Sequence, residues 1–315
     1  MSADTSNIPV LIYQGHSDYV FCAAWSSDGM SVASGSRDTT VRVWNAITGL
    51  DSNIYRGHSS SLLSVAWSPD GTYIASGDTD GVISVWEALT GRNIITYRGH
   101  TRFVRSIAWS PDGMSIASGG DYGDSTTQVW EAFTGNTIYT HKDQYRIFAV
   151  AWSSDGNRIA SGSFDGSVHI WDAFTGHNLF SYTGHSAPVY AMGWSPDGGC
   201  IASAGHDMTV RVWSATTAET LCVYSGHTRP VKALAWSPDS KYVVSGGDDA
   251  LVRVWEAATG KFIAVYGAYP KWIRTVTWSP NGRFIAFAYD QTVLVVAAHC
   301  ISTFPSSICN DNPEA

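Results

Sequence analysis

The chain has 315 residues and a formal net charge of −8 at pH 7, with 44% hydrophobic and only 15% charged residues. This composition excludes a disordered chain, which would be poor in aromatic residues and rich in charge. The acidic balance argues against a surface coated for nucleic acid, and no apolar run reaches the roughly 20 residues that a membrane-spanning helix needs.

The N-terminus and the cysteines indicate the compartment. The first residues lack a basic start followed by an apolar run and a cleavage site, so we expect no signal peptide. The five cysteines are odd in number and have no Cys-x-x-Cys spacing. We therefore expect free thiols in a reducing, cytoplasmic location.

One segment, Trp-Ser-x-Asp-Gly or a close variant of it, recurs every 42 or 43 residues. It begins at Trp25, Trp67, Trp109, Trp152, Trp194, Trp236 and Trp278. A second tryptophan follows at Trp44, Trp86, Trp130, Trp171, Trp213 and Trp255, and Val296 takes that place in the seventh unit. Thirteen of the 14 tryptophans are therefore repeat positions, and Trp272 is the exception.

The alternation of apolar and polar residues in each unit predicts short strands separated by turns. In the first unit, strands are predicted over residues 20–25, 31–36 and 41–44, with an Asp-Gly turn after the first strand. Complete outer strands are predicted near residues 54–56, 94–97, 137–140, 179–182, 221–224 and 262–266. Four strands per unit make one small antiparallel sheet, which would be marginal alone but stable when seven sheets pack around an axis.

The inner three strands occur seven times, whereas the outer strand follows only six of the units. The missing strand is predicted at Val10–Gln14, which would complete the last sheet beside Val293–Val296 and close the ring. An alternative places Ile301–Phe304 there. The sequence thus predicts an all-β, seven-bladed propeller of four-stranded antiparallel blades over residues 10–304, with an N-terminal extension at 1–9 and a disordered tail at 305–315.

The order of Gly-His, WSPDG, ASGS-x-D and a strand ending in Trp resembles the WD-repeat β-propeller family over about residues 10–300. The WSPDG motif and the near-identity of the units resemble repeats common in bacterial WD-repeat proteins. The resemblance implies an interaction scaffold whose partners are proteins or peptides.

The resemblance also implies a hydrogen-bonded chain of His, Ser, Asp and Trp in each blade. The implied sets are His16, Ser34, Asp38, Trp44; His58, Ser76, Asp80, Trp86; His100, Ser118, Asp124, Trp130; His185, Ser203, Asp207, Trp213; and His227, Ser245, Asp249, Trp255. Buried polar groups must be paired, and a linked network stiffens a sheet. Residues present in nearly every blade cannot mark one active site, so we assign these sets no catalytic role.

Three units depart from the pattern. The fourth has Asp143 at the His register, and the seventh has Tyr269, Ala286 and Val296 in place of His, Ser and Trp. We expect these two blades to be less tightly held. The third unit has two extra residues in its second turn, on the same rim as the irregular loop before the fourth unit. These departures are explained either by loop variation without a functional role or by function, and the sequence leaves both explanations open.

Residues that occupy the same place in each unit but differ from unit to unit are the ones we expect to determine what the molecule binds. In the WD-repeat family three registers face the top rim, which carries the second turns and the loops between units. Of the 21 residues at these registers, eight are aromatic, five are Arg or Lys, and Asp248 is the single acid. We predict a partner-binding surface made of Tyr19, Arg37, Phe103, Arg105, Arg146, Phe164, Tyr190, His206, Lys232, Trp272, Arg274 and Tyr289.

The basic residues at this rim favour an acidic or phosphorylated peptide. The competing interpretation is that several aromatics, such as Phe21 and Phe148, pack inward between blades. No HExxH, GxSxG or GxxxxGK[ST] motif occurs, so we expect no enzyme, cofactor or metal. We also expect a monomer that binds no membrane. A propeller enzyme or small-molecule binder using the central channel, and weak binding of single-stranded nucleic acid, stay as alternatives.

Overall fold

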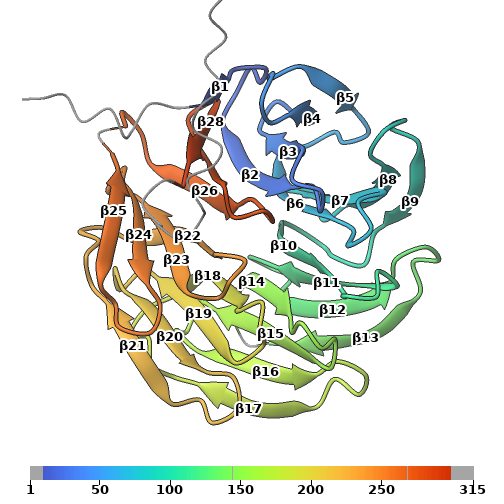
Figure 1. Cartoon of the computed structure of the whole chain (residues 1–315). Coiled ribbons are helices and arrows are strands. Elements are labelled where there is room, and N and C mark those ends of the chain that lie inside the picture. Colours follow the sequence, from blue (N-terminus) through green and yellow to red (C-terminus); the bar gives the residue numbers. More distant parts are fainter. Residues whose placement is uncertain (1–9, 144, 268, 299–315) are drawn as a thin grey trace, which may run out of the picture.

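The computed structural model describes residues 10–143, 145–267 and 269–298, and it contains seven four-stranded antiparallel sheets arranged in a ring (Figure 1). Within the described residues no helix is long and apolar enough to cross a membrane. The predicted seven-bladed propeller is confirmed. The expected extension at 1–9 and tail at 305–315 lie outside the described residues.

Each of the first six blades contains four strands that are consecutive in the chain. Blades one to three consist of β2 (Val20–Trp25), β3 (Ser31–Ser36), β4 (Val41–Asn45), β5 (Asp51–Tyr55); β6 (Leu62–Trp67), β7 (Tyr73–Asp78), β8 (Ile83–Glu87), β9 (Asn93–Tyr97); and β10 (Val104–Trp109), β11 (Ser115–Gly120), β12 (Thr126–Glu131), β13 (Thr137–Lys142). Blades four to six consist of β14 (Ile147–Trp152), β15 (Arg158–Ser163), β16 (Val168–Asp172), β17 (Asn178–Tyr182); β18 (Val189–Trp194), β19 (Cys200–Gly205), β20 (Val210–Ser214), β21 (Thr220–Tyr224); and β22 (Val231–Trp236), β23 (Tyr242–Gly247), β24 (Val252–Glu256), β25 (Phe262–Tyr266).

The seventh blade joins the two ends of the propeller. It consists of β26 (Ile273–Trp278), β27 (Phe284–Tyr289) and β28 (Thr292–Ala297), with β1 (Leu11–Tyr13) as its outer strand. Leu11 pairs with Val295 and Tyr13 with Val293, and the backbone N–H of Val10 donates to the carbonyl of Val295. The predicted closure by Val10–Gln14 is confirmed, and the alternative segment at 301–304 lies outside the described residues.

The first turn of each blade shows why the repeat folds as it does. In blade one, Gly29 has a φ of 69°, a left-handed conformation that glycine adopts without steric cost. The carboxylate of Asp28 accepts hydrogen bonds from the Ser26 hydroxyl and the Met30 backbone N–H. The Ser-x-Asp-Gly sequence therefore closes the hairpin between the first two strands by its own side chains.

The tryptophans that end the inner strands tie neighbouring blades together. The Trp67, Trp109, Trp152, Trp194 and Trp236 indoles each donate to a carbonyl oxygen of the preceding blade, at 2.9–3.3 Å. The seventh blade is the exception. The Trp278 indole donates to Gly282 in its own turn, and the Trp25 indole has no hydrogen-bond partner among the described residues. The two edges of the seventh blade therefore lack this link.

We predict that Trp109→Ala lowers the free energy of unfolding by about 3–5 kcal/mol, because it empties a core position and removes a link between blades. The Trp109 side chain is buried, and its indole donates to the Ala66 carbonyl at 3.2 Å. Trp272 is 50% exposed, so Trp272→Ala should change the free energy by no more than about 0.5 kcal/mol. Urea unfolding of both variants tests this, and a large loss for Trp272→Ala would place that side chain in the core.

Candidate functional site

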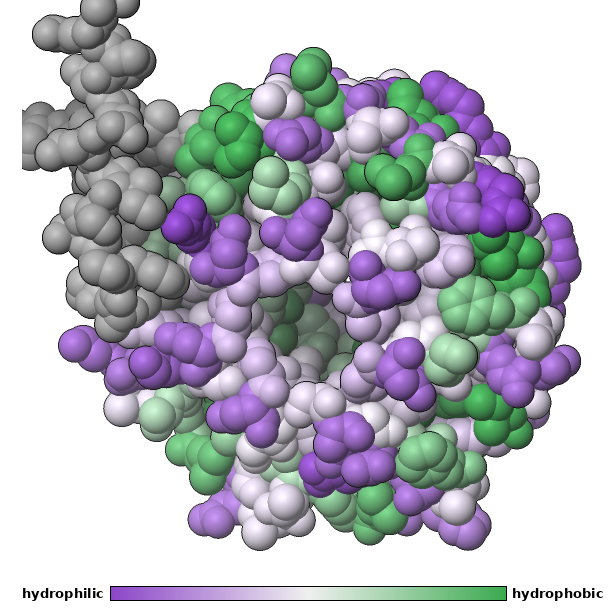
Figure 2. All heavy atoms as spheres, turned by 45° about the vertical axis from the view of Figure 1, so that its right-hand side comes forward, coloured by the Kyte–Doolittle hydropathy of each residue, from purple (hydrophilic) through white to green (hydrophobic). Residues whose placement is uncertain are grey.

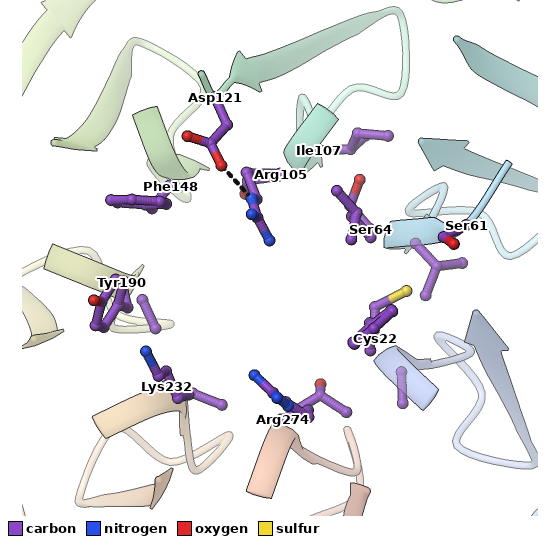
Figure 3. Close-up of a pocket in the computed structure, with 18 of the residues that line it drawn as sticks. Cys22, Ser61, Ser64, Arg105, Ile107, Asp121, Phe148, Tyr190, Lys232 and Arg274 are labelled. Atoms are coloured by element: carbon purple, nitrogen blue, oxygen red, sulfur yellow. Dashed lines mark hydrogen bonds and ion pairs between the residues drawn. The ribbon is translucent and has the colours of Figure 1, made fainter. Parts of the chain in front are cut away.

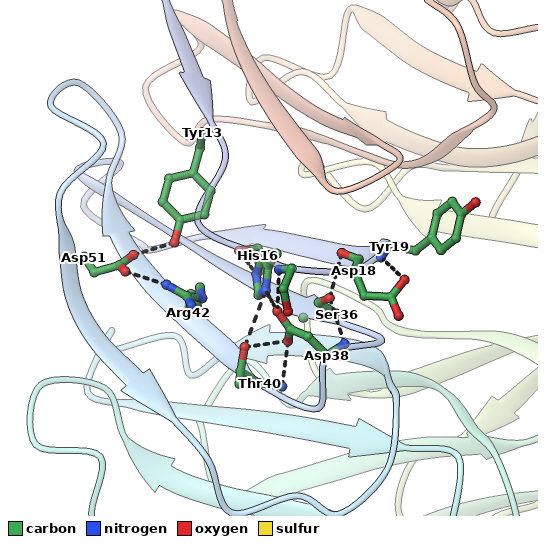
Figure 4. A network of polar contacts seen from close by, with 12 residues as sticks. Tyr13, His16, Asp18, Tyr19, Ser36, Asp38, Thr40, Arg42 and Asp51 are labelled. Carbon is green, nitrogen blue, oxygen red and sulfur yellow. Dashed lines mark hydrogen bonds and ion pairs between the residues drawn. The ribbon is translucent and has the colours of Figure 1, made fainter.

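The polar chain of blade one shows how the scaffold holds its rim (Figure 4). The Trp44 indole donates to the Ser34 hydroxyl at 3.1 Å, and His16 contacts Ser34 through Nε2 at 2.9 Å and Asp38 through Nδ1 at 2.8 Å. Because a carboxylate only accepts, Nδ1 carries the proton and, in the neutral ring, Nε2 accepts from Ser34. Burial opposes ionisation of Asp38, yet hydrogen bonds from His16 and Thr40 hold its pKa well below the usual value.

The same chain forms in blades three, five and six, as implied by the resemblance. Asp124, Asp207 and Asp249 contact the Nδ1 atoms of their histidines at 3.1, 2.9 and 2.9 Å. The serines and tryptophans of these chains are Ser118, Trp130, Ser203, Trp213, Ser245 and Trp255. In these four blades the aspartate belongs to the second turn, so the chain fixes that turn to the sheet.

Blade two differs from the sequence prediction in one residue. Asp80 was expected to bind His58, but Asp78 makes this contact at 2.8 Å, and Asp80 is exposed. Asp78 also accepts the backbone N–H groups of Asp80 and Val82. Asp78 is the last residue of β7 and is buried. Its carboxylate takes the position beside the histidine that the second-turn aspartate takes in other blades. Ser76 and Trp86 complete the chain as expected.

The fourth blade lacks the histidine of the chain. Trp171 still donates to Ser161 at 2.8 Å, while the His141 ring packs on Trp171 at 3.8 Å, where a tyrosine stacks in other blades. Asp143 is half-buried; its Oδ1 lies 3.6 Å from His141 Nε2, and its Oδ2 has no hydrogen-bond partner among the described residues. Burial and the nearby Asp165 raise the pKa of Asp143 to about 7. This blade therefore holds two carboxylates where other blades hold a His–Asp pair.

A cavity of about 770 Å³ opens at the centre of the ring, where the inner strands meet. Figure 2 shows a hollow in the middle of one face of the molecule. Seven of the predicted partner-binding residues line the cavity: Arg37, Arg105, Arg146, Phe164, Tyr190, Lys232 and Arg274. In Figure 3, Arg105, Lys232 and Arg274 point into the hollow from three different blades. We call this group of seven residues the channel mouth.

The other five predicted residues lie around the channel mouth. Tyr19 and Trp272 line a second cavity of about 360 Å³ with Pro270, Lys271, Asp290 and Arg274. Phe103 lies 5.7 Å from the Arg105 guanidinium, and the exposed His206 stacks on Tyr190 at 6.0 Å. Tyr289 stacks on Tyr269 in the seventh blade and lines neither cavity. Phe21 and Phe148, which could have packed between blades, line the central cavity.

Cations lie against aromatic rings at the channel mouth. The Lys232 ammonium lies 3.6 Å from the centre of the Tyr190 ring, and the Arg146 guanidinium lies 5.3 Å from that of Phe164. Burial lowers the pKa of Lys232, and the positive charges of Arg274 and Arg105 add to this effect against the attraction of Asp248. The three cations are therefore close enough to repel one another, which favours an anion between them.

Two residues that the sequence reasoning missed shape this site. Asp121 accepts a hydrogen bond from Arg105 at 2.6 Å and lies 3.7 Å from Arg146. The ring of Tyr122 lies 4.5 Å from the Arg146 guanidinium. Both residues belong to the lengthened turn of the third unit, so the two extra residues were the signal that could have found them.

The described residues contain no group of three or more His, Cys, Asp or Glu side chains that could hold a metal ion. A family model described as the WD domain, G-beta repeat matches seven segments, at residues 7–45, 50–87, 91–131, 134–172, 176–214, 218–256 and 260–296. None of the curated proteins compared with the chain matches it.

We predict that Asp78→Ala lowers the free energy of unfolding by about 1–3 kcal/mol, because it leaves the buried His58 Nδ1–H and two turn N–H groups without an acceptor. Asp80→Ala removes an exposed carboxylate, so its effect should stay within about 0.5 kcal/mol. Urea unfolding of the two variants gives the comparison. Equal losses would show that Asp80 also holds the blade.

We predict that Asp143→Asn stabilises the protein at pH 8 and much less at pH 5. The folded-state pKa of Asp143, about 7, lies above the ordinary value of 3.8. The protonated carboxyl therefore stabilises the fold at low pH, and this contribution is lost as the pH rises through 7. The asparagine stays neutral at both pH values. Melting temperatures with Asp80→Asn as the exposed control measure the effect, and an equal gain at both pH values would contradict it.

Proposed function

Because the chain belongs to the WD40-repeat family, we propose that it is a non-enzymatic scaffold whose top rim binds an acidic or phosphorylated peptide segment of another protein. The WD40 propeller typically serves as a protein-interaction scaffold and is usually non-catalytic. One observation carries the proposal: five cations and several aromatic rings converge on one cavity, whose lining contains a single acid, Asp121.

Contacts at the rim show why an anion fits there. Arg105 and Arg146 share Asp121, Lys232 faces Asp248 at 3.7 Å, and Arg37 faces Asp18 at 3.8 Å. Arg274 makes no ion pair with any described residue and instead lies 4.9 Å from the Trp272 ring centre. Charge-assisted hydrogen bonds to carboxylate or phosphate are among the stronger contacts that such side chains make.

The rigid ring contributes to binding as well. Arg105, Lys232 and Arg274 lie near the starts of paired inner strands, and Arg37 precedes the bonded Asp38. A surface fixed in this way loses little conformational entropy when a partner binds. We propose that a peptide, rather than a nucleic acid, is the partner, because the chain as a whole carries a net charge of −8.

Further parts of the proposal rest on the sequence. We propose a monomer of bacterial origin, located in the cytoplasm and bound to no membrane. The described cysteines Cys22, Cys200 and Cys222 are free thiols, as a reducing compartment would leave them. A small molecule in the central cavity is the second candidate, because about 770 Å³ lies within the range of small-molecule sites.

We predict that replacing Arg105, Lys232 and Arg274 with glutamine weakens binding of a fluorescent, degenerate phosphoserine peptide pool by about tenfold or more. The matched control replaces Arg92, Lys241 and Arg283, which are exposed in turns on the opposite rim, with glutamine. This control has the same net charge and should bind like the wild type. Fluorescence anisotropy at two salt concentrations gives the affinities.

Equal weakening in both variants would show a general charge effect and contradict a specific site. No binding of the phosphorylated pool or of an acidic pool by the wild type would overturn the proposed peptide function. Tighter binding of random single-stranded DNA than of either pool would favour a nucleic-acid partner.

A further inference from the structure

The second cavity lies at the seam where the ring closes. It is lined by Tyr19 of blade one, by Pro270, Lys271 and Trp272 before β26, by Arg274 in β26, and by Asp290 between β27 and β28. Arg274 also lines the central cavity. We call the smaller cavity the seam pocket. One guanidinium therefore lies on the lining of both hollows, so a single bound segment can contact both.

The channel mouth has a surplus of positive charge. Its five cations, Arg37, Arg105, Arg146, Lys232 and Arg274, face three carboxylates, those of Asp18, Asp121 and Asp248. Two positive charges remain uncompensated among the described residues. A phosphoryl group carries a charge of about −1.5 to −2 and three acceptor oxygens, whereas a carboxylate carries −1. The surplus therefore fits a phosphoryl group better than a carboxylate.

The seam pocket offers a different chemistry. Trp272 is 50% exposed, although every other tryptophan of the described chain is buried or half-buried. The Arg274 guanidinium lies 4.9 Å from the Trp272 ring centre, and Tyr19 and Pro270 also line the pocket. A partner's aromatic ring would stack on this surface and gain apolar burial and ring contacts.

We propose that the partner segment is bipartite: a phosphorylated residue binds at the channel mouth, and an aromatic side chain of the same segment binds in the seam pocket. This inference rests on the proposed function and specifies its ligand. An extended chain advances about 3.3 Å per residue, and alternate side chains point the same way. Because Arg274 lines both subsites, the two side chains come from positions close together in the segment.

The proposal predicts a defined sequence preference. A positional-scanning array carries peptides with a fixed central phosphoserine, in which each flanking position is set to each amino acid in turn. The wild type should prefer Phe, Tyr or Trp by several-fold at a position close to the phosphoserine. Trp272→Ala should lose this preference yet still favour phosphorylated over unphosphorylated peptides. The control Phe174→Ala truncates an exposed aromatic residue of a third turn and should keep both preferences.

The possible outcomes distinguish a failure of the bipartite ligand from a failure of the proposed function. Binding that requires phosphoserine but shows no aromatic preference overturns the bipartite ligand and leaves the proposed function standing. An aromatic preference that survives in Trp272→Ala removes the seam pocket from the site. Equal binding of phosphoserine and glutamate peptides overturns the phosphoryl assignment, and binding of neither class overturns both proposals.

Discussion

The hydrogen-bonded chain from tryptophan through serine and histidine to aspartate is the interaction on which the other features depend. It links the third strand of a blade, its second strand and its second turn through buried groups, as in Trp44, Ser34, His16 and Asp38. Buried polar groups are costly unless paired, so the chain selects one conformation of the turn. The residue before the aspartate is a rim residue, and the scaffold thereby sets its position.

The blade that lacks both the serine and the tryptophan of this chain is also the blade that closes the ring. Blade seven has Ala286 and Val296 in the serine and tryptophan places, and the Trp278 indole bonds within its own turn. Its outer strand comes from the other end of the chain, through the pairing of β1 with β28. The seam pocket with Trp272 lies beside this junction. An interface between blades that lacks the tryptophan link is thus the place where the rim offers an exposed tryptophan.

The sequence predicted the blades and their closure because the repeat spacing and the missing outer strand are properties of the chain alone. It did not predict which of two carboxylates binds His58, because Asp78 and Asp80 are two residues apart and only the strand end decides between them. Likewise, counting registers placed Phe103 and Arg105 together at the rim. Only side-chain directions show that Arg105 points into the cavity while Phe103 lies outside it.

The central claim is that repeated residues build the disc and varied residues at one rim bind the partner. Hydrogen exchange of the full chain, with and without a saturating phosphoserine peptide pool, tests it most directly. Added protection is expected only in top-rim segments, around residues 18–21, 37, 103–105, 121–122, 146–148, 164, 188–190, 230–232 and 270–274. Protection in the first or third turns on the opposite rim, or no change anywhere, would contradict the claim.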